Sequence, residues 1–290
     1  MPVKQYQEFI PHATLQDTVK RFWILEKEYT PEDSIEEVTP DACVELIFNF
    51  GRPYIQDVGA TKREVSKVCL VGLLNKPLLL HASGLVKLVA VRLYAWGALT
   101  FLKSAASRNS AAAVDLDPAW WQVIERVSEN VHLSDYQKAV EEIEDFLIGL
   151  RLNTMFDPQR VRTAAKLLYH TKGQFRVAEL ADQCSLSLRQ LQRQFDETTG
   201  VSPKTLARNI RFEAIRERLM FDPQTNLTDL AYEFGYSDQA HFIKDFKAFT
   251  DKTPSEFVNE TRRFREMLRD HENIVFLPSP STMPDYNDAP

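Results

Sequence analysis

In the first hundred residues, the hydrophobic positions fall into short runs that are separated by turn-forming residues. The runs are rich in Val, Leu and Ile, are bounded by Gly, Pro or Asn, and cover 43–50, 66–74, 77–83 and 86–94. Short runs of this kind are typical of β-strands. We therefore expect residues 1–100 to be strand-rich, with one early helix over 14–22.

After residue 118 the spacing of the hydrophobic positions changes. Over 119–152 they recur three and four residues apart with charged residues between them, which predicts amphipathic helices. The helical pattern continues from Pro158 to about residue 265, and the rest is a Pro-, Ser- and Asp-rich stretch that predicts a loosely ordered tail. The chain thus divides into an N-terminal domain, a helical C-terminal domain and a tail, at 1–155, 156–265 and 266–290.

The strongest signal is an internal repeat of about 50 residues, with copies at 180–206 and 230–257. The first matches are 50 residues apart and the later ones are 51 apart, so one residue is inserted in the second copy. The matched pairs are Leu180 and Leu230, Ala181 and Ala231, Ser187 and Ser237, Phe195 and Phe246, Pro203 and Pro254, and Leu206 and Phe257.

Each copy has the pattern of a helix-turn-helix. In the first copy, Ser185 lies at the turn, and Ser187 with Gln190 predicts a capping box at the start of the second helix. The residues expected to be buried are Val177, Leu180, Ala181, Cys184, Leu186, Leu188, Leu191 and Phe195. The exposed face of the second helix then carries Arg189, Gln192, Arg193 and Gln194.

In the second copy, Gly235 supplies the turn, where a positive φ is often needed, and Tyr236 takes the place of Leu186. The residues expected to be buried are Leu227, Leu230, Ala231, Phe234, Phe242, Phe246 and Phe249. The exposed face of the second helix carries Gln239, Ile243, Lys244 and Lys247. Between the copies, residues 204–220 predict one long helix that holds the two units at a fixed separation.

These exposed side chains fit the chemistry of duplex DNA. Arg donates two hydrogen bonds to guanine in the major groove, and Gln pairs with adenine, while Lys and Arg also neutralise phosphates. Two units on one face of a duplex would lie about one helical turn apart, ~34 Å. Solvated surface arginines remain the alternative interpretation of Arg189 and Arg193.

The distribution of charge agrees with a DNA-binding C-terminal domain, although the whole chain has a formal net charge of −6. Residues 160–265 hold 18 Lys and Arg against 14 Asp and Glu, so they form the basic part of an acidic protein. Residues 1–159 hold 16 against 22, and the tail holds one against five. This excess is weak support by itself, because a solvated mixed surface gives the same count.

Composition excludes several other classes of protein. No apolar run approaches the roughly 18 residues that span a bilayer, and the first residues lack a secretory signal pattern, so we expect no membrane partner. The three cysteines are far apart and form no CxxC pair, which indicates reduced thiols in a cytoplasm; they are Cys43, Cys69 and Cys184. The six histidines are scattered without metal-ligand spacing.

Residues 160–265 resemble the DNA-binding domain of the AraC/XylS family of regulators. The resemblance rests on LSLRQLQRQF with GVSP, on the central Arg-rich helix, and on LAYEFGYSDQAHFIKDF followed by TPSEF. By position, it implies that the two recognition helices contact DNA, the first through Arg189, Gln192 and Arg193, and the second through Asp238, Gln239 and Lys244, with Lys247 beside them. Two residues depart from the family, since Ser185 and Asp251 replace glycines. Asp245 in addition places an acid near the second DNA face.

The N-terminal part resembles, less specifically, the sensor domains of such regulators. The segments at 39–51 and 91–98 are similar to stretches of one poorly characterised subgroup. The resemblance implies a small β-barrel that binds a ligand or a partner, and it does not identify the ligand.

Several N-terminal residues permit a functional and a structural interpretation. Arg92 could hold an anionic ligand, but we favour a pairing with Glu45 or another acid, because an unpaired buried charge is costly. Asp41, Cys43 and Glu45 could suggest catalysis, yet no basic neighbour or histidine that would activate a thiolate is evident. For the helices around Trp120-Trp121, dimerisation and packing within the domain are equally open.

The sequence thus predicts an α+β protein, with a β-barrel-like N-terminal domain that carries helices and an all-α C-terminal domain of two helix-turn-helix units joined by a long helix. We expect a bacterial, cytoplasmic, sequence-specific transcription regulator that binds double-stranded DNA. Its N-terminal domain would respond to a small-molecule effector or form a homodimer, and activation and repression are both open. The alternative is a DNA-targeted enzyme or repair protein, but no nucleophile–base pair, phosphate loop or metal cluster supports it, so we expect no catalytic residue, cofactor or metal.

Overall fold

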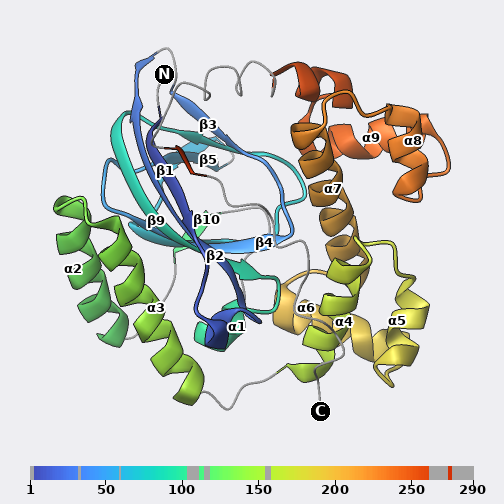
Figure 1. Cartoon of the computed structure of the whole chain (residues 1–290), viewed down its shortest axis with the longest axis horizontal. Helices are drawn as coiled ribbons and strands as arrows, with labels where there is room; N and C mark the ends of the chain where they lie inside the picture. Colours follow the sequence, from blue (N-terminus) through green and yellow to red (C-terminus); the bar gives the residue numbers. More distant parts are fainter. Residues whose placement is uncertain are drawn as a thin grey trace.

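The computed structural model describes residues 3–31, 34–58, 60–102, 111–113, 118–153, 158–260 and 274–275. Within these residues, the N-terminal part consists of two β-sheets and a pair of helices, and the C-terminal part is helical (Figure 1). No helix in these ranges is long and apolar enough to cross a membrane.

The larger sheet has seven strands in the order β10-β7-β4-β9-β2-β1-β11. Its centre is the antiparallel pairing of two 11-residue strands, in which Phe22 faces Val91 and Ile24 faces Val89. Only β11 joins in parallel, beside β1. The strands are β1 (Val3–Phe9), β2 (Val19–Tyr29), β4 (Cys43–Asn49), β7 (Val68–Val71), β9 (Gly84–Tyr94), β10 (Ala111–Ala113) and β11 (Ile274–Val275).

The smaller sheet has four strands in the order β3-β8-β5-β6, which are β3 (Ile35–Val38), β5 (Ile55–Val58), β6 (Thr61–Glu64) and β8 (Leu78–His81). Buried residues of both sheets, including Tyr29, Val71, Leu80 and Val86, form one hydrophobic cluster. The sheets therefore bury apolar side chains against each other, as two layers of a sandwich do.

Two amphipathic helices, α2 (Pro118–His132) and α3 (Tyr136–Asn153), lie beside the larger sheet (Figure 1). Trp120 of α2 stacks on Phe48 of β4 with ring centroids 6.2 Å apart, and meets Phe146 of α3 edge to face at 4.8 Å. The same cluster includes Phe22 and Ile24. Because side chains alternate along a strand, β2 contributes to this core with one face and to the core between the sheets with the other.

Two sequence-based expectations about the N-terminal part are wrong. Across the described residues, hydrogen bonds between strands form two separate open sheets rather than a closed barrel, because no pairing joins the seven-stranded and four-stranded sheets. Residues 14–22 do not form a helix: only the 3₁₀ turn η1 (Ala13–Leu15) is present, and β2 begins at Val19. Pairing on both sides, with β1 and β9, overrides the local pattern in this stretch. Three of the four predicted strand runs contain β4, β7 and β8, and the fourth, 86–94, covers all of β9 except its first two residues.

The C-terminal part is built around α7 (Pro203–Phe221). This is the long helix predicted over 204–220, and its observed bounds differ by one residue at each end. The other labelled helices are α1 (Ala98–Phe101), which follows β9, and α4 (Gln159–His170), α5 (Val177–Gln183), α6 (Leu188–Thr199), α8 (Leu227–Glu233) and α9 (Gln239–Thr250), and residues 254–260 are helical as well. We refer to α5 with α6 as the first helix pair and to α8 with α9 as the second helix pair.

The two helix pairs are buried in different cores. Phe195 and Leu206 of the C-terminal part belong to the cluster that includes the larger sheet and α2, so the first helix pair shares its core with the N-terminal part. The second helix pair packs on the distal half of α7 in a separate cluster that includes Phe212, Phe246 and Phe249. Tyr169 of α4 connects the parts, since its ring lies edge-on to both Tyr94 and Trp96.

The turn after α4 approaches α7 so closely that only glycine fits. Gly173 has a φ of +72°, and a Cβ atom there would lie 2.1 Å from the backbone oxygen of Ala207. We expect Gly173→Ala to reduce the free energy of unfolding by about 1–3 kcal/mol, because α7 must shift and the backbone is strained.

The matched control for this change is Gly149→Ala inside α3, where a Cβ would meet nothing within 4 Å. It should raise the free energy of unfolding by about 0.5–1 kcal/mol, since alanine favours helix. Urea unfolding curves of the two variants test both expectations. If Gly173→Ala were as stable as the wild type, the close approach of this turn to α7 would be contradicted.

Candidate nucleic-acid interface

The first helix pair is joined by the four residues 184–187, and the geometry of this turn follows from its residues. Ser185 has a φ of +52°, so it takes the left-handed conformation that glycine usually supplies. Ser187 caps α6: its hydroxyl accepts the N–H of Gln190, and the Gln190 side chain accepts the N–H of Ser187 at 2.9 Å. The predicted capping box is confirmed, and it fixes where α6 begins.

The inner face of α6 is fully buried through Leu191 and Phe195, each 0% exposed. The outer face presents the predicted residues Arg189, Gln192 and Arg193, all exposed. The structure brings these three together in one surface hollow, which is also lined by Asp196, Ser202 and Thr205. The sequence did not single out the last three, because they lie beyond the recognition face or at the start of α7. Arg193 lies 3.9 Å from Glu197, and such an exposed pair contributes little.

One residue of α6 was assigned to the wrong face. Leu188 was expected to be buried, but its side chain is 54% exposed. It shares a helical stripe with Leu191 and Phe195, yet it is the first residue of α6 and has no further turn of helix to cover it. The buried stripe of α6 therefore begins at Leu191, about one turn after the N-terminal end of the helix.

The second helix pair repeats this arrangement, and it shows where the extra residue of the repeat lies. Gly235 has a φ of +74° at the turn and corresponds to Ser185. The cap of α9, however, is Asp238, whose carboxylate accepts the N–H of His241 at 2.7 Å. Asp238 therefore corresponds to Ser187, and the inserted residue is Ser237. This corrects the alignment of Ser187 with Ser237.

The cap also explains the charge of Asp238. Its pKa is lowered by the hydrogen bonds from the His241 backbone and the Ser237 hydroxyl, so the side chain is a carboxylate at neutral pH. The carboxylate is exposed, and it is already engaged by α9. In the structure, the Asp238 side chain caps the N-terminal end of α9. Contact between Asp238 and DNA stays a prediction.

The outer face of α9 carries Gln239, Lys244 and Lys247, all exposed as predicted, while Ile243 is half-buried. Asp245 was expected to place an acid near this face. The structure instead pairs its carboxylate with Arg208 of α7 at 2.6 Å and with the Tyr236 hydroxyl at 2.8 Å. Asp245 therefore fastens the second helix pair to α7, and Arg208 neutralises its charge.

The other departure from the family pattern is also explained by backbone geometry. Asp251 ends α9 with a φ of +56°, in the position that Gly200 occupies after α6 with a φ of +73°. Aspartate tolerates this left-handed conformation better than most residues. Both helices consequently end in the same way.

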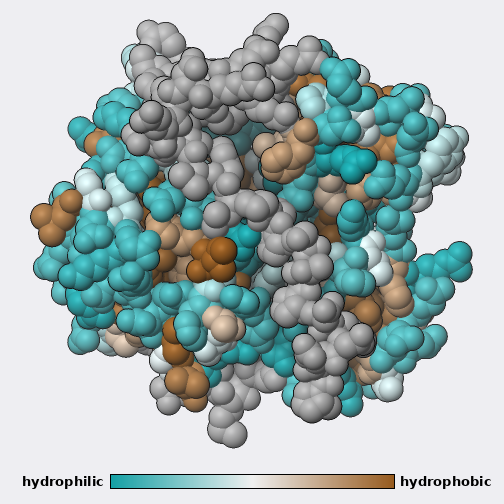
Figure 2. All heavy atoms as spheres, in the orientation of Figure 1, coloured by the Kyte–Doolittle hydropathy of each residue, from teal (hydrophilic) through white to brown (hydrophobic). Residues whose placement is uncertain are grey.

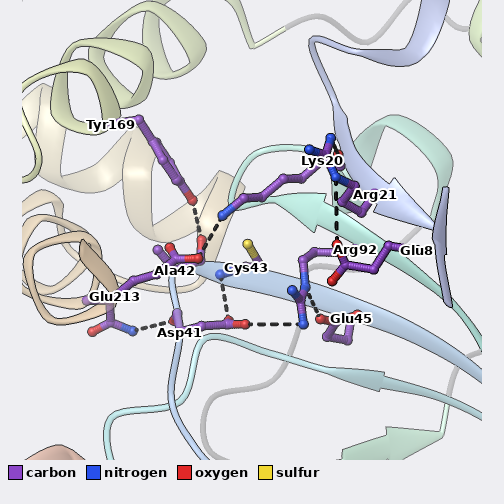
Figure 3. Close-up of polar contacts among 11 residues, drawn as sticks. Glu8, Lys20, Arg21, Asp41, Ala42, Cys43, Glu45, Arg92, Tyr169 and Glu213 are labelled. Carbon is purple, nitrogen blue, oxygen red and sulfur yellow. Dashed lines mark hydrogen bonds and ion pairs between the residues drawn. The ribbon is translucent and has the colours of Figure 1, made fainter. Parts of the chain in front are cut away.

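The N-terminal sheet contributes a polar cluster near α4 and α7 (Figure 3). Arg92 donates to Glu45 at 2.5 Å, as expected from the sequence, and lies 3.8 Å from Asp41. The Trp23 indole also donates to Glu45. Arg92 is thus paired within the protein.

Cys43 lies at the centre of this cluster and is buried. The expectation that it lacks basic neighbours is wrong, since Lys20 and Arg92 both act on it electrostatically. Burial nevertheless raises the pKa of the thiol well above its ordinary value, and Glu213 and Asp41 add to the shift. Cys43 is therefore a neutral thiol, which is the opposite of an activated nucleophile.

Among the described residues, the donor atoms of Asp41, Cys43 and Glu213 lie within 4.8 Å of one another, close enough to consider a metal ion. The position next to Glu213 is already taken by a cation, because the Lys20 ammonium lies 2.7 Å from its carboxylate. The thiol is also protonated. These residues do not fit a metal site.

The two tryptophans at the start of α2 behave differently. Trp120 is 2% exposed and belongs to the core, whereas Trp121 is 50% exposed beside a shallow hollow that Ile124 and Leu133 also line. On the face that Figure 2 draws, hydrophilic residues cover most of the described surface. Dimerisation through α2 stays a prediction.

Comparison with known proteins gives matches for both parts of the chain. Residues 180–260 match a family described as a helix-turn-helix domain, and residues 7–115 match one described as a domain of unknown function (DUF6597). The HTH-type transcriptional activator RhaS of Escherichia coli is 40% identical over 68 residues, which are 23% of this chain and 24% of that protein. The alignment therefore covers only about a quarter of the length of these curated relatives.

Two solved structures are also similar. ToxT from Vibrio cholerae is 12% identical, with 88% of this chain and 98% of that chain covered and a TM-score of 0.45. The C-terminal domain of AraT, a response regulator from Geobacillus stearothermophilus, is 20% identical, with 46% and 98% covered and a TM-score of 0.33.

The matched region 180–260 begins within α5 and includes α6, α7 and the second helix pair, so this part of the chain is a helix-turn-helix domain. The similarity to RhaS, an HTH-type transcriptional activator, agrees with a helix-turn-helix domain in this part of the chain.

Proposed function

We propose that this protein is a sequence-specific transcription regulator that reads duplex DNA with both helix pairs, each acting as a helix-turn-helix unit. The observation that carries the proposal is the cluster of Arg189, Gln192 and Arg193 on the outer face of α6, held from behind by buried Leu191 and Phe195. A rigid helix that presents Arg and Gln side chains fits the major groove and its base edges.

The second helix pair would contribute through Gln239, Lys244 and Lys247, with Asp238 at the helix start. The two units are joined by the 19 residues of α7, which correspond to about 28 Å of helix. This length is close to one turn of duplex, ~34 Å. The geometry thus favours two recognition elements about one turn apart on the same face of the DNA.

We assign the DNA-binding domain to 156–265 and a regulatory domain to 1–155. The regulatory domain contacts α4 and α7 directly, so an effector or a second copy of the chain that acts on it can reach the DNA-binding helices. A DNA-targeted enzyme would need a reactive group in this domain, and the neutral Cys43 thiol does not supply one. We further propose that the protein works in the cytoplasm of a bacterium.

The test is to capture fragments of bacterial genomic DNA with the purified full-length chain and to sequence them. A motif of two elements about one turn apart would support reading by both units. Recovery of diffuse fragments without a motif, with and without added cell extract as a source of effector, would refute sequence-specific binding.

Salt should weaken the complex steeply, because phosphate contacts release counterions from DNA. If Arg189, Arg193, Lys244 and Lys247 each neutralise one phosphate, log Kd should rise with log salt concentration with a slope of about 3–4. Fluorescence anisotropy titrations between 50 and 200 mM salt, conditions in which this effect is large, measure the slope. A flat response would contradict the groove model.

A further inference from the structure

The middle of α7 is fastened to the N-terminal sheet by a buried ion pair. Lys20 of β2 and Glu213 of α7 are 193 residues apart in sequence, and their charged atoms lie 2.7 Å apart. Their side chains are only 13% and 8% exposed. Burial raises the pKa of Glu213, but Lys20 together with Arg216 and Arg92 outweighs this, so the net pKa is lowered and the carboxylate stays charged.

One turn earlier on α7, Asn209 adds a directional contact to the same sheet. Its side-chain amide donates to the backbone oxygen of Leu74 at 2.7 Å and to that of Asp41 at 3.2 Å, and the residue is 1% exposed. Asn209 and Glu213 therefore hold one face of α7 by hydrogen bonds whose geometry permits little rotation of the helix.

The same segment of the sheet also holds α4. The Tyr169 hydroxyl donates to the backbone oxygen of Ala42, next to the Asp41 oxygen that receives Asn209 (Figure 3). Asp41 is in turn fixed by accepting the N–H of Cys43 at 2.8 Å and by its pairing with Arg92. Residues 41–43 thus connect the charged network of the sheet to two helices of the DNA-binding domain.

These anchors lie between the surfaces that the two helix pairs use on α7. Leu206 and Ile210 belong to the core of the first pair, and Phe212 and Ile215 belong to the core of the second. A further contact, Lys252 to Glu37 at 3.2 Å, joins the end of the second pair to β3. The recognition residues on α6 and α9 remain exposed in this arrangement, so the sheet supports the DNA-binding helices without covering them.

We propose that Asn209 and Glu213 are positioning residues for DNA recognition, which hold α7 on the N-terminal sheet so that both helix pairs keep one fixed relative orientation. The inference rests on the proposed function and adds the means by which the regulatory domain acts on it. When two linked units bind one duplex, the second binds with an advantage that depends on the geometry of the link. Loosening the anchor should therefore weaken two-element binding and leave single-element binding unchanged.

The test compares two duplexes in anisotropy titrations: a captured two-element site, and the same site with one element scrambled. Lys20→Glu and Glu213→Lys each place like charges together, and each should weaken binding of the two-element duplex by about tenfold or more, with single-element binding unchanged. The double variant Lys20→Glu/Glu213→Lys restores an ion pair in reverse and should recover most of the affinity.

A second variant removes the ion pair without placing like charges together, in case the charge-reversed variants fail to fold. Lys20→Met/Glu213→Leu replaces the pair by apolar groups of similar size, a change that buried ion pairs often tolerate in stability, but it removes the directional contact. It too should weaken two-element binding selectively. Unchanged or tighter two-element binding in this folded variant, or an equal loss for both duplexes, would overturn the proposal. If the wild-type chain binds captured and fully scrambled duplexes equally, the proposed function fails, and this inference fails with it.

Discussion

Replacing both Arg189 and Arg193 by alanine is expected to abolish sequence-specific DNA binding. Each base-contacting arginine typically contributes about 1–3 kcal/mol, so the double variant should lose about 2–6 kcal/mol if the two contacts are independent. Both side chains are exposed in the same hollow and neither is required by the core, so the fold should be unaffected. Anisotropy titration of the captured motif at fixed salt measures the loss.

The matched control removes two positive charges from exposed positions on β6 and α3 of the N-terminal part. Lys62 of β6 and Lys138 of α3 are both exposed on the N-terminal part. Lys62→Ala/Lys138→Ala changes the net charge by the same amount and should leave the preference for the motif intact. If the arginine variant recovered the same motif as the wild type, α6 would not be the reading helix.

Phe195→Ala is expected to produce the largest loss of stability. Phe195 is 0% exposed in the core that joins the first helix pair to the sheet, and removing a core aromatic costs about 3–5 kcal/mol. Leu188→Ala on the same helix is the control, because Leu188 is 54% exposed and surface changes usually stay within about 0.5 kcal/mol. Urea unfolding distinguishes them, and equal midpoints for the two variants would contradict the assignment of the inner face of α6.

The parts of this structure that the sequence predicted depend on neighbours within one or two helical turns. Ser187 and Gln190 are three residues apart, so their capping box is a local property, and the spacing of Leu191 and Phe195 reports the buried face directly. Leu188 fits the same spacing but is exposed, because burial at a helix end depends on how far the packing partner extends.

The parts that the sequence did not predict depend on partners far away in the chain. Strands such as β1 and β6 carry many polar residues and are formed by pairing with neighbouring strands, which leaves little hydrophobic pattern to read. Lys20 and Glu213 look like ordinary surface charges until the fold brings them together. The task of Asp245 was misread for the same reason, since Arg208 lies on another helix.

The unequal division of the hydrophobic cores has a consequence for how this architecture can be recombined in evolution. The first helix pair and α4 share their apolar surface with the sheet, so a cut near residue 155 would expose hydrophobic area on both fragments, and a replacement N-terminal part would need a matching surface. The second helix pair has its own core and joins the rest chiefly through α7. Substitutions inside this core would therefore leave the core that is shared with the sheet in place.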